Sequence, residues 1–413
     1  MRLLSKLHVQ LFIAITAGIL FGALFPSQAS RLTPVGNAFI WLIRPLLAPI
    51  VFGTVTLGIG KMSDLKSVGR LGIKAMVYFQ VLSGLALLMG LAVADIVQPG
   101  AGMKVGTLAK PPVTAKTTDG FLYDLEKYLL HPSILVVLLI AICAGIALSR
   151  VNDKDQQRIN AALETFLRVM FLLVRWVMYV APIAAFGAIA VVIGKYGLAN
   201  LLPYAKLVTC VYATCLLFLI VALAPIARLS GVSLWRFLGY ILDEILIVFG
   251  TCSTEPVLPR MIAKLEALGC PGSLVGLVLP AGYSFNADGT SVYLTLAALF
   301  IAQATHTPLT LRDQLTVLGV LILTSKGSAG VAGGGLVILT ATLSATNKIP
   351  MSGLTLVLGI ESLLNQPRAV TNLIGNGVAT LAMARWERVL DLNQARRRLA
   401  HPIKKGDERL PLC

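Results

Sequence analysis

Polar side chains interrupt an otherwise apolar stretch near the end of the chain, "GIESLLNQPRAVTNLIGNG". Six of them are Glu361, Asn365, Arg368, Thr371, Asn372 and Asn376. At about 100° per residue, all of them except Thr371 fall within an arc of roughly 80° on one helix. The guanidinium of Arg368 presents a planar fork of donors that matches a carboxylate. The stretch therefore predicts a helix with one polar face that can bind an anion.

Two roles are open for Arg368. It could form an internal ion pair, with Glu361 two turns back or with Glu255 as its partner, or it could bind an anionic substrate. Three amides on the same face offer more donors and acceptors than an ion pair needs, which favours a substrate. Pro367 has no N–H to return to the carbonyl of Leu363, so we expect a kink beside the arginine.

A second polar interruption, "GYSFNADGTS", occupies residues 282–291 of another apolar stretch. We expect the backbone to be unwound here, so that the carbonyls of Gly282 and Asn286 lie beside the carboxylate of Asp288. Small hard cations prefer several oxygen ligands. The segment therefore predicts a cation site. The alternative is a glycine kink in which Asp288 pairs with a lysine, such as Lys326.

Two further apolar stretches, 240–268 and 313–346, are broken centrally by "GTCSTEP" and "TSKGSAGVAGGG". A helix that breaks at Ser, Thr and Gly exposes N–H groups and a positive dipole end, which suit anions. Alternatively, the hydroxyls cap or join helices and the glycines permit close packing. Flanking a polar segment, the two breaks predict re-entrant hairpins whose tips meet at a transporter binding site.

The elements that must position these residues are expected to cross a membrane. Of the 413 residues, 56% are hydrophobic and only 13% are charged. A transmembrane helix needs about 20 mostly apolar residues. The sequence predicts an all-α polytopic membrane protein with two re-entrant hairpins and eight transmembrane helices. The eight spans lie near residues 9–25, 36–59, 75–98, 133–149, 166–193, 205–227, 272–304 and 350–386.

The positive charges predict the orientation of these spans. A net charge of +16 could suggest a nucleic-acid partner, but Lys and Arg collect in short loops and tails, as they do on the cytoplasmic side of membrane proteins. We therefore predict no nucleic-acid partner, a location in the cell inner membrane and cytoplasmic termini. The first stretch resembles a signal peptide, but its removal would place the basic loops on the wrong side.

Catalytic and metal-binding patterns are weak in this sequence. Six cysteines show no CxxC spacing and are expected to be free thiols. Four histidines lie at span ends or in tails, so a nucleophile such as Cys252 or Ser253 would lack an intramembrane base. We predict neither an enzyme nor a cofactor. A channel would need a continuous hydrated path, which a few polar segments do not provide, and a carrier fits them better.

The four motifs "GTCSTEPVLPRM", "GYSFNADGTS", "SKGSAGVAGGG" and "RAVTNLIGNG" occur in this order. Together with "VQPGAGM" and "APIAAFGAIA", they resemble the dicarboxylate/amino acid:cation symporter family, which shares the fold of the glutamate transporters. The resemblance extends over about residues 6–391 and is strongest to the bacterial C4-dicarboxylate carriers. It implies a homotrimer whose protomers each move a transport region against a scaffold, like an elevator.

The resemblance also implies a division of the chain. A single transporter domain would occupy residues 1–391, followed by a basic cytoplasmic tail at 392–413. The scaffold would lie mainly in 9–72 and 133–193, and the transport region mainly in 73–98 and 205–386.

Site residues follow from the same motifs. The substrate would bind to Ser253, Thr254, Gly330, Asn365, Arg368 and Asn372, with Arg368 taking the distal carboxylate. The coupling ion, H+ or Na+, would bind to Gly282, Ser284, Asn286, Asp288, Ser325, Ser328 and Asn376, with Ser83 beside Asp288.

Departures from the family pattern narrow the function. Amino-acid carriers hold an aspartate for the substrate ammonium where this chain has Asn365, so succinate, fumarate or malate fits better. Asn376 also replaces an aspartate of sodium-coupled relatives, which removes an attraction of order 4 kcal/mol for a cation. With Phe79 and Leu82 in place of oxygen-bearing residues, protons carried on Asp288 or Glu361 are favoured. The alternative is a sodium-coupled symporter of aspartate or glutamate.

Overall fold

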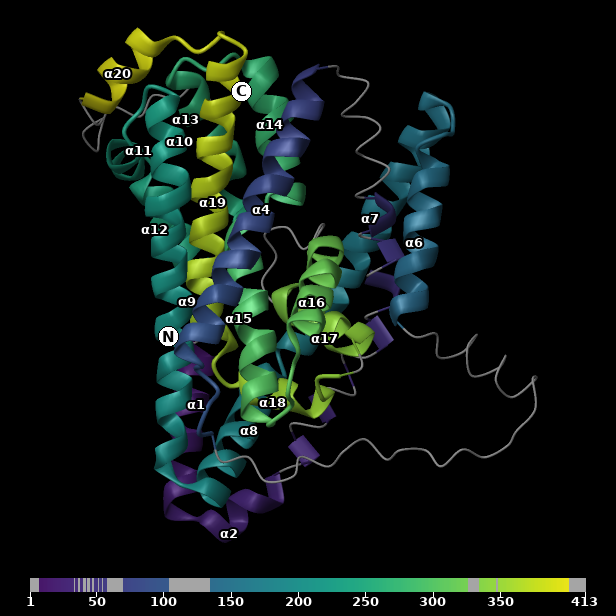
Figure 1. The fold of residues 1–413 in the computed structure, drawn as a ribbon, viewed down its shortest axis with the longest axis vertical. Helices are drawn as coiled ribbons and strands as arrows, with labels where there is room; N and C mark the ends of the chain where they lie inside the picture. Colours follow the sequence, from purple (N-terminus) through teal and green to yellow (C-terminus); the bar gives the residue numbers. More distant parts are fainter. Residues whose placement is uncertain are drawn as a thin grey trace.

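The computed structural model describes residues 7–32, 70–103, 134–325, 334–346 and 348–400, with scattered positions between 34 and 57. Every regular element in these residues is a helix, as predicted (Figure 1). Three helical stretches in this part of the chain are long and apolar enough to cross a membrane: Arg70–Val97, Leu198–Leu229 and Gly272–Ala304.

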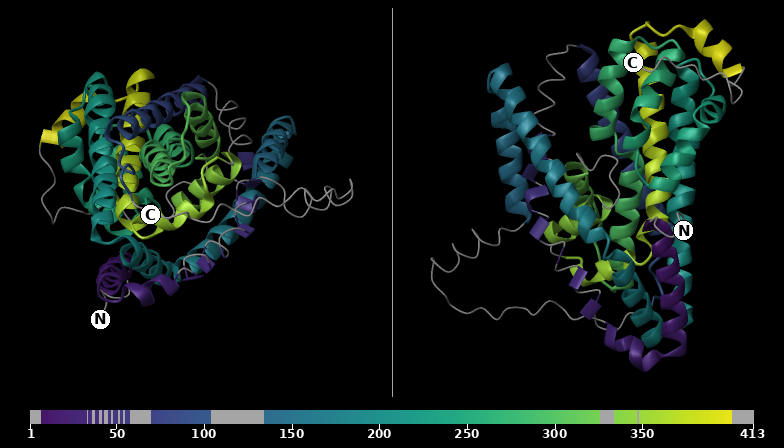
Figure 2. Two further views of the ribbon diagram at one scale, coloured as in Figure 1. Left: turned by 60° about the horizontal axis from the view of Figure 1, so that its bottom comes forward. Right: turned by 180° about the vertical axis from the view of Figure 1, so that it is seen from behind.

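Helix α15 (Asp288–Ala304) lies at the centre of the molecule. All of its residues except Gln303 are buried. It packs against α4 (Arg70–Val97), α9 (Leu201–Phe218) and α19 (Glu361–Trp386). The left view of Figure 2 shows this segment enclosed by other helices. A helix that is apolar on all sides needs such an enclosure.

The predicted interruption in "GYSFNADGTS" is present but short. Helix α14 (Gly272–Phe285) ends before Asn286, and α15 resumes at Asp288. Only Asn286 and Ala287 leave the helical path. The break therefore exposes the end of one half-helix and the start of the next at the same point.

The broken segment 240–268 folds back on itself. Its elements are α11 (Leu234–Tyr240), α12 (Leu242–Thr251), the 3-10 turn η4 (Glu255–Val257) and α13 (Leu258–Ala267). The carboxylate of Glu244, wholly buried, forms an ion pair with Arg260 Nε at 3.0 Å and accepts a hydrogen bond from Lys264 Nζ at 2.6 Å. These contacts align α12 antiparallel to α13, with residues 252–254 at the tip.

The segment 313–346 forms a second helical pair, α16 (Leu311–Thr324) and α17 (Gly334–Thr346). The Thr310 side chain and Asp313 form a capping box that begins α16. The hydroxyls of Thr324 and Thr342 lie 3.3 Å apart across the pair. The predicted tip, residues 326–333, lies outside the described residues.

Pro225 accounts for a change of helix type after α9. The chain continues through a π-helical turn, η3 (Leu219–Leu223), into α10 (Ala224–Leu229). A proline inside a helix lacks one N–H and crowds the carbonyl of the preceding turn. The wider turn accommodates this without ending the helix.

Two predicted spans are divided. The expected span 166–193 contains a turn at residues 179–180, between α7 (Asp153–Met178) and α8 (Ala181–Tyr196). Pro182 in the first turn of α8 favours a new helix start there, because its missing N–H needs no partner. The expected span 350–386 likewise turns at residues 359–360, after α18 (Leu354–Leu358) and before α19. In contrast, α19 runs unbroken through Pro367.

Helix α1 (Leu7–Leu24) lies along α8 through two glycines. A Cβ at Gly18 would lie 2.8 Å from the Phe186 carbonyl oxygen, and one at Gly22 would lie 2.7 Å from that of Ala190. Small residues permit this close approach of helices. The remaining elements are α2 (Pro26–Ala29), η1 (Ser30–Leu32), α6 (Ile134–Leu148), η2 (Leu198–Asn200), η5 (Met351–Gly353) and α20 (Leu392–Ala400).

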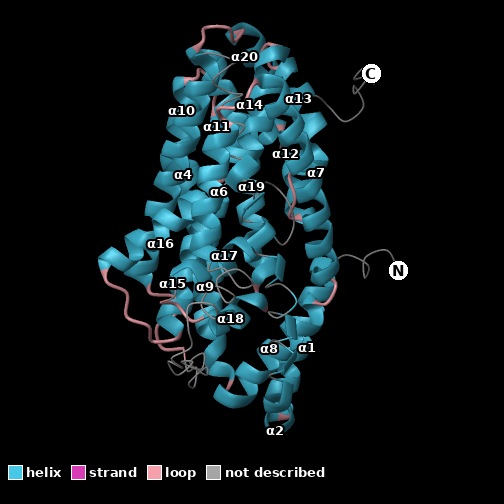
Figure 3. Ribbon diagram, turned by 90° about the vertical axis from the view of Figure 1, so that its right-hand side faces the viewer, coloured by secondary structure: helices cyan, strands magenta, loops and turns pink. Residues whose placement is uncertain are grey.

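Most helices run along the long axis of the molecule, with α20 at one end and α2 at the other (Figure 3). At the α20 end, Glu387 accepts Arg70 Nη2 at 3.2 Å and Lys74 Nζ at 2.5 Å. The hydrogen bonds from Lys74 and Arg70 lower the pKa of Glu387 below its ordinary value. This ion-pair clamp joins the start of α4 to the end of α19.

Candidate substrate and cation site

Arg368 lies at the meeting point of α19 and α15. Its side chain is 0% exposed, and Nη1 donates to the hydroxyl of Thr290 at 3.4 Å. The two helices can approach this closely because Gly289 has no Cβ. A Cβ at this position would collide with the Arg368 carbonyl oxygen. A buried guanidinium requires partners that satisfy its charge and donors. The centre of the predicted substrate site is therefore an enclosed cation.

Asn372, one turn further along α19, caps the start of α15. Its Oδ1 accepts the N–H groups of Gly289 at 2.8 Å and Thr290 at 3.3 Å, and its Nδ2 donates to Thr290 Oγ1 at 2.9 Å. These bonds satisfy donors that a helix start leaves without intrahelical acceptors. Thr290 thus links Asn372 to Arg368, and the amide is fixed next to the guanidinium.

Glu361 and Asn365 lie on the same face of α19. Both side chains are buried, and Asn365 Nδ2 donates to Glu361 Oε1. Glu361 is also close enough to Arg368 for an electrostatic interaction. Glu255, the other partner considered for Arg368, is exposed. Of the two carboxylates considered as partners, Glu361 is thus the buried one and acts electrostatically on the arginine.

The tip of the first hairpin reaches this group. Cys252 adopts a left-handed backbone conformation, with φ of 53°, and is buried within electrostatic range of Glu361 and Arg368. Thr254 is buried and Ser253 is half-buried. The Thr251 hydroxyl holds the turn by donating to the Ser253 carbonyl at 3.1 Å. The predicted substrate residues Ser253 and Thr254 thus follow directly on a residue that neighbours Arg368.

The second hairpin reaches the same region from α17. A Cβ at Gly335 would lie 2.8 Å from the Tyr293 ring and 3.5 Å from Asn365 Oδ1. The start of α17 is therefore next to the polar face of α19. Lys326, Ser328 and Gly330, which sequence reasoning assigned to the tip, lie outside the described residues.

The predicted cation ligands Gly282, Asn286, Asp288 and Asn376, called the cation cluster below, come together where α14 and α15 meet α19. Asn286 Nδ2 donates to Asp288 Oδ2 at 3.0 Å and to Asn376 Oδ1 at 3.1 Å. A Cβ on Gly282 would lie 2.6 Å from Asn376 Oδ1. The Asn286 Oδ1 atom, although buried, has no hydrogen-bond partner among the described residues. The cluster thus contains several buried oxygen atoms, and the backbone of α14 at Gly282 lies very close to the Asn376 side chain.

The remaining predicted ligands are less closely grouped. Ser325 is buried at the end of α16, and its hydroxyl donates to the Ile322 carbonyl at 3.5 Å. Ser284 is half-buried on α14. Ser83 is buried on α4, and its hydroxyl has no hydrogen-bond partner within the described part of the chain. Phe79 and Leu82, neighbours of Ser83 on α4, are also buried, so apolar surface adjoins this serine.

Thr290 and Tyr293 were missed from the sequence. Thr290 receives hydrogen bonds from both Arg368 and Asn372. Tyr293 is wholly buried within electrostatic range of Glu361 and Arg368. The signal for Thr290 was its place in the "NADGT" motif, within the first turn of a new helix. For Tyr293 it was a phenolic oxygen three residues further along the same apolar helix.

Thiols and carboxylates do not combine into a metal centre in the described residues. There is no group of three or more His, Cys, Asp or Glu side chains able to hold a metal ion in this part of the chain. Cys143, Cys210, Cys215, Cys252 and Cys270 are free thiols, as predicted. The groups that the described part of the site presents are amide, hydroxyl, carboxylate and guanidinium groups.

Comparisons with known proteins agree with the motifs. The model of the sodium:dicarboxylate symporter family matches residues 7–386. The C4-dicarboxylate transport protein of Serratia proteamaculans (strain 568) is 45% identical over 426 residues, which cover 100% of this chain and 99% of that protein. The protein of the same name from Solibacter usitatus (strain Ellin6076) is 48% identical over 404 residues, covering 94% of each chain. The similarity thus includes every helix that contributes to the site.

Proposed function

The chain belongs to the sodium:dicarboxylate symporter family, and on that premise we propose that it imports C4-dicarboxylates such as succinate, fumarate or malate together with cations. Family membership makes it a transporter and not an enzyme, as the motifs indicated. The observation that carries the choice of substrate is the fully buried Arg368 on a helix face whose other polar groups are mainly neutral amides.

In this proposal, Arg368 binds the distal carboxylate through its planar donors. Asn372 and the first-hairpin residues Ser253 and Thr254 bind the other carboxylate, and the second hairpin closes over it near Gly330. Support comes from the electrostatic proximity of Cys252 to Arg368 and from the start of α17, which lies next to Asn365 on the same polar face of α19. Saturable binding to such a group suits a carrier, in which one substrate is enclosed at a time.

Asn365 determines the class of substrate in this scheme. A carboxylate here would attract the ammonium of an amino acid and repel a second substrate carboxylate. The neutral amide does neither, and its Nδ2 is already engaged by Glu361. Acidic amino acids are the second candidate substrates. Among the described residues, Glu361 is the carboxylate beside Asn365 that could attract their ammonium group.

Protons are the proposed coupling ions. Asn376 leaves the cation cluster with Asp288 as its single acidic side chain. Sodium would have to be held by oxygens carrying little net charge, which weakens its binding. A proton needs only a carboxylate that takes it up when desolvated, and both Asp288 and Glu361 are buried.

The membrane arrangement belongs to the same proposal. We infer eight spans and two re-entrant hairpins, with cytoplasmic termini in the inner membrane, and homotrimers in which the transport region moves as an elevator. Helix α20 and the Arg70–Lys74–Glu387 clamp lie at the same end of the molecule. This placement supports a common cytoplasmic side for the basic segments.

Counterflow in proteoliposomes tests this function. Vesicles loaded with unlabelled succinate should take up external labelled succinate to a transient excess, because a carrier exchanges substrate across the membrane. Unlabelled fumarate and malate should compete, and aspartate should compete poorly. Uptake that does not saturate would favour a channel, and stronger competition by aspartate would favour the amino-acid alternative.

A further inference from the structure

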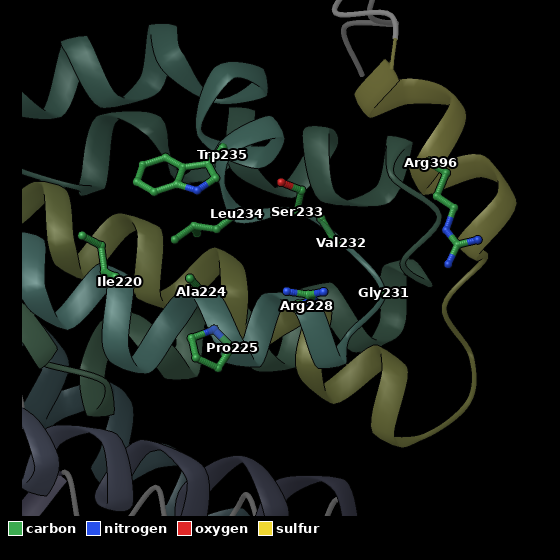
Figure 4. Close-up of a pocket in the computed structure, with 10 residues that line it drawn as sticks. All are labelled: Ile220, Ala224, Pro225, Arg228, Gly231, Val232, Ser233, Leu234, Trp235 and Arg396. Atoms are coloured by element: carbon green, nitrogen blue, oxygen red, sulfur yellow. The ribbon is translucent and has the colours of Figure 1, made fainter.

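A cavity lies at the α20 end of the molecule, outside the candidate site. Its volume is about 710 Å³, and it is lined by η3, α10, the turn that follows, the start of α11 and Arg396 of α20. Figure 4 shows Arg228 of α10 and Arg396 facing this space from different helices. None of these residues belongs to the substrate or cation groups, so the cavity has a separate role.

The two arginines that line the cavity, Arg228 and Arg396, are exposed, and their charges are not paired within the described residues. Neither Arg228 nor Arg396 takes part in an ion pair or side-chain hydrogen bond with them. Guanidinium groups bind phosphate oxygens bidentately and with directional preference. Two of them in one cavity therefore favour an anion with several oxygens.

The remainder of the cavity is apolar and open to the sides of the molecule. Trp235 is 61% exposed, Ile220 is 45% exposed and the neighbouring Leu229 is 82% exposed. Tryptophan is enriched where a protein meets the headgroup region of a bilayer. A ligand that fills both halves must carry an anionic group at one end and a hydrocarbon chain at the other.

Helix α20 strengthens the preference for a lipid. Ala395 and Leu399 are buried, whereas Arg396, Arg397 and Arg398 form a basic surface beside them. Hydrogen bonds from Asp391 N to the Gly269 carbonyl at 3.1 Å and from Gln394 Nε2 to the Ala267 carbonyl at 3.0 Å fix the helix across the end of α13. Exposed clusters of arginines such as these attract anionic membrane surfaces.

We propose that this cavity binds an anionic phospholipid of the cytoplasmic leaflet. The phosphodiester lies between Arg228 and Arg396, and an acyl chain follows Trp235 and Ile220 toward the bilayer. Inorganic phosphate shares the headgroup chemistry but has no chain to cover the apolar half. Lipid bound here would join α10, α11 and α20, which are otherwise connected through a small number of side chains.

Thermal unfolding of the purified full-length protein in detergent tests the assignment. Added phosphatidylglycerol should raise the melting temperature, while phosphatidylcholine and sodium phosphate should not. The Arg228→Gln/Arg396→Gln double variant should need a roughly thirtyfold higher phosphatidylglycerol concentration for the same increase, since each arginine contributes to binding the anionic headgroup. The single variant Arg396→Gln, which leaves α10 intact, should give an intermediate shift.

A matched control removes equal charge elsewhere at the basic surface. Arg150 and Arg236 are exposed and do not line the cavity. The Arg150→Gln/Arg236→Gln variant should respond to phosphatidylglycerol as the unmodified protein does. An equal response to phosphatidylcholine, an equal response to phosphate, or equal losses in the two double variants would each overturn the proposal.

Fluorescence provides a second readout that does not depend on stability. In a variant keeping only Trp235, with Trp41, Trp176 and Trp386 changed to Phe, brominated phosphatidylglycerol should quench emission at lower concentration than brominated phosphatidylcholine. The Arg228→Gln/Arg396→Gln changes should remove this difference. Quenching without headgroup preference would mean that Trp235 contacts bulk lipid and that no site exists.

Discussion

At the scale of single residues, Thr290 explains how a charged group is accommodated inside this protein. Its hydroxyl accepts hydrogen bonds from Arg368 Nη1 and from Asn372 Nδ2. Asn372 Oδ1 in turn accepts a hydrogen bond from the first N–H groups of α15. The guanidinium is therefore positioned in part by neutral groups, with the carboxylate of Glu361 also within electrostatic range. Neutral donors and acceptors of this kind orient the planar fork without adding a further charge beside it.

Arg368→Ala should abolish succinate uptake, because the loss of charged hydrogen bonds to one carboxylate costs about 1.5–3 kcal/mol of binding for each bond. Arg368→Lys should retain weak uptake with a raised KM, since an ammonium lacks the planar fork. Uptake in proteoliposomes measures both. Normal transport by Arg368→Ala would exclude the residue from the substrate site, and failure of that variant to accumulate in membranes would assign it to the ion pair with Glu361.

Asn365→Asp should weaken the binding of succinate and strengthen the binding of aspartate. The new carboxylate would repel a substrate carboxylate and attract an ammonium, so the change in preference has two causes. Competition of both ligands against labelled succinate gives the ratio, with Asn365→Ser as a neutral control that should keep the preference for succinate. An unchanged ratio in Asn365→Asp would place this residue outside the site.

At the scale of helices, the interruptions were predictable and their geometry was not. Gly and polar residues in apolar stretches marked the breaks at Asn286 and after Thr251. Irregular backbone at membrane depth is tolerated only where it is buried in protein or lines an aqueous cavity, so such residues indicate a break in the helix. The turn at residues 179–180 was missed, since the surrounding sequence remains apolar and only Pro182 signals a new helix. Helix capping by Asn372 was equally hidden, because its partner lies 83 residues away in sequence.

Close packing between α19 and the α14–α15 break depends on Gly375. A Cβ there would collide with Asp288 Oδ2 and would lie 3.2 Å from Asn286 Nδ2. We expect Gly375→Ala to lower the stability of the protein by about 1–3 kcal/mol through overpacking, and to impair coupling to the cation. Gly276→Ala is the control, because a Cβ on that residue of α14 meets nothing within 4 Å. Equal melting temperatures and equal uptake in the two variants would contradict this role.

The clamp between α4 and α19 should make stability depend on acid pH. Lys74 and Arg70 lower the pKa of Glu387 in the folded protein. A carboxyl of this kind contributes stability above its unfolded pKa of about 4.3, and loses that contribution as the pH falls through its lower folded pKa. Melting temperature should therefore drop below about pH 4 more steeply in the unmodified protein than in Glu387→Gln. Parallel profiles would mean that the clamp adds nothing to stability.

At the scale of the whole molecule, the central position of α15 unites the parts that the sequence shows separately. Its start is capped by Asn372, its first turn contacts Arg368, and the cation cluster lies at the break before it. Motifs far apart in the sequence suggested a common site, but only the fold shows that one helix start contacts both Arg368 and Asn372 and lies beside the cation cluster. Any movement of this junction would affect the two groups together, which is what coupled transport requires.

A proton, and not sodium, is the ion expected to drive uptake. Asn376 adds an amide where sodium-coupled relatives have a carboxylate, and Phe79 and Leu82 cover the α4 side near Ser83 with apolar surface. We expect succinate uptake to rise with an inward proton gradient and to persist when sodium is replaced by potassium or choline. Asp288→Asn should abolish the response to the proton gradient, because the single acidic group of the cation cluster is lost. Imposing the pH and sodium gradients separately on the same proteoliposomes distinguishes proton coupling from sodium coupling. Uptake that requires sodium and ignores the pH gradient would show that Asp288 and the neighbouring carbonyl and amide oxygens hold Na+ without a second carboxylate.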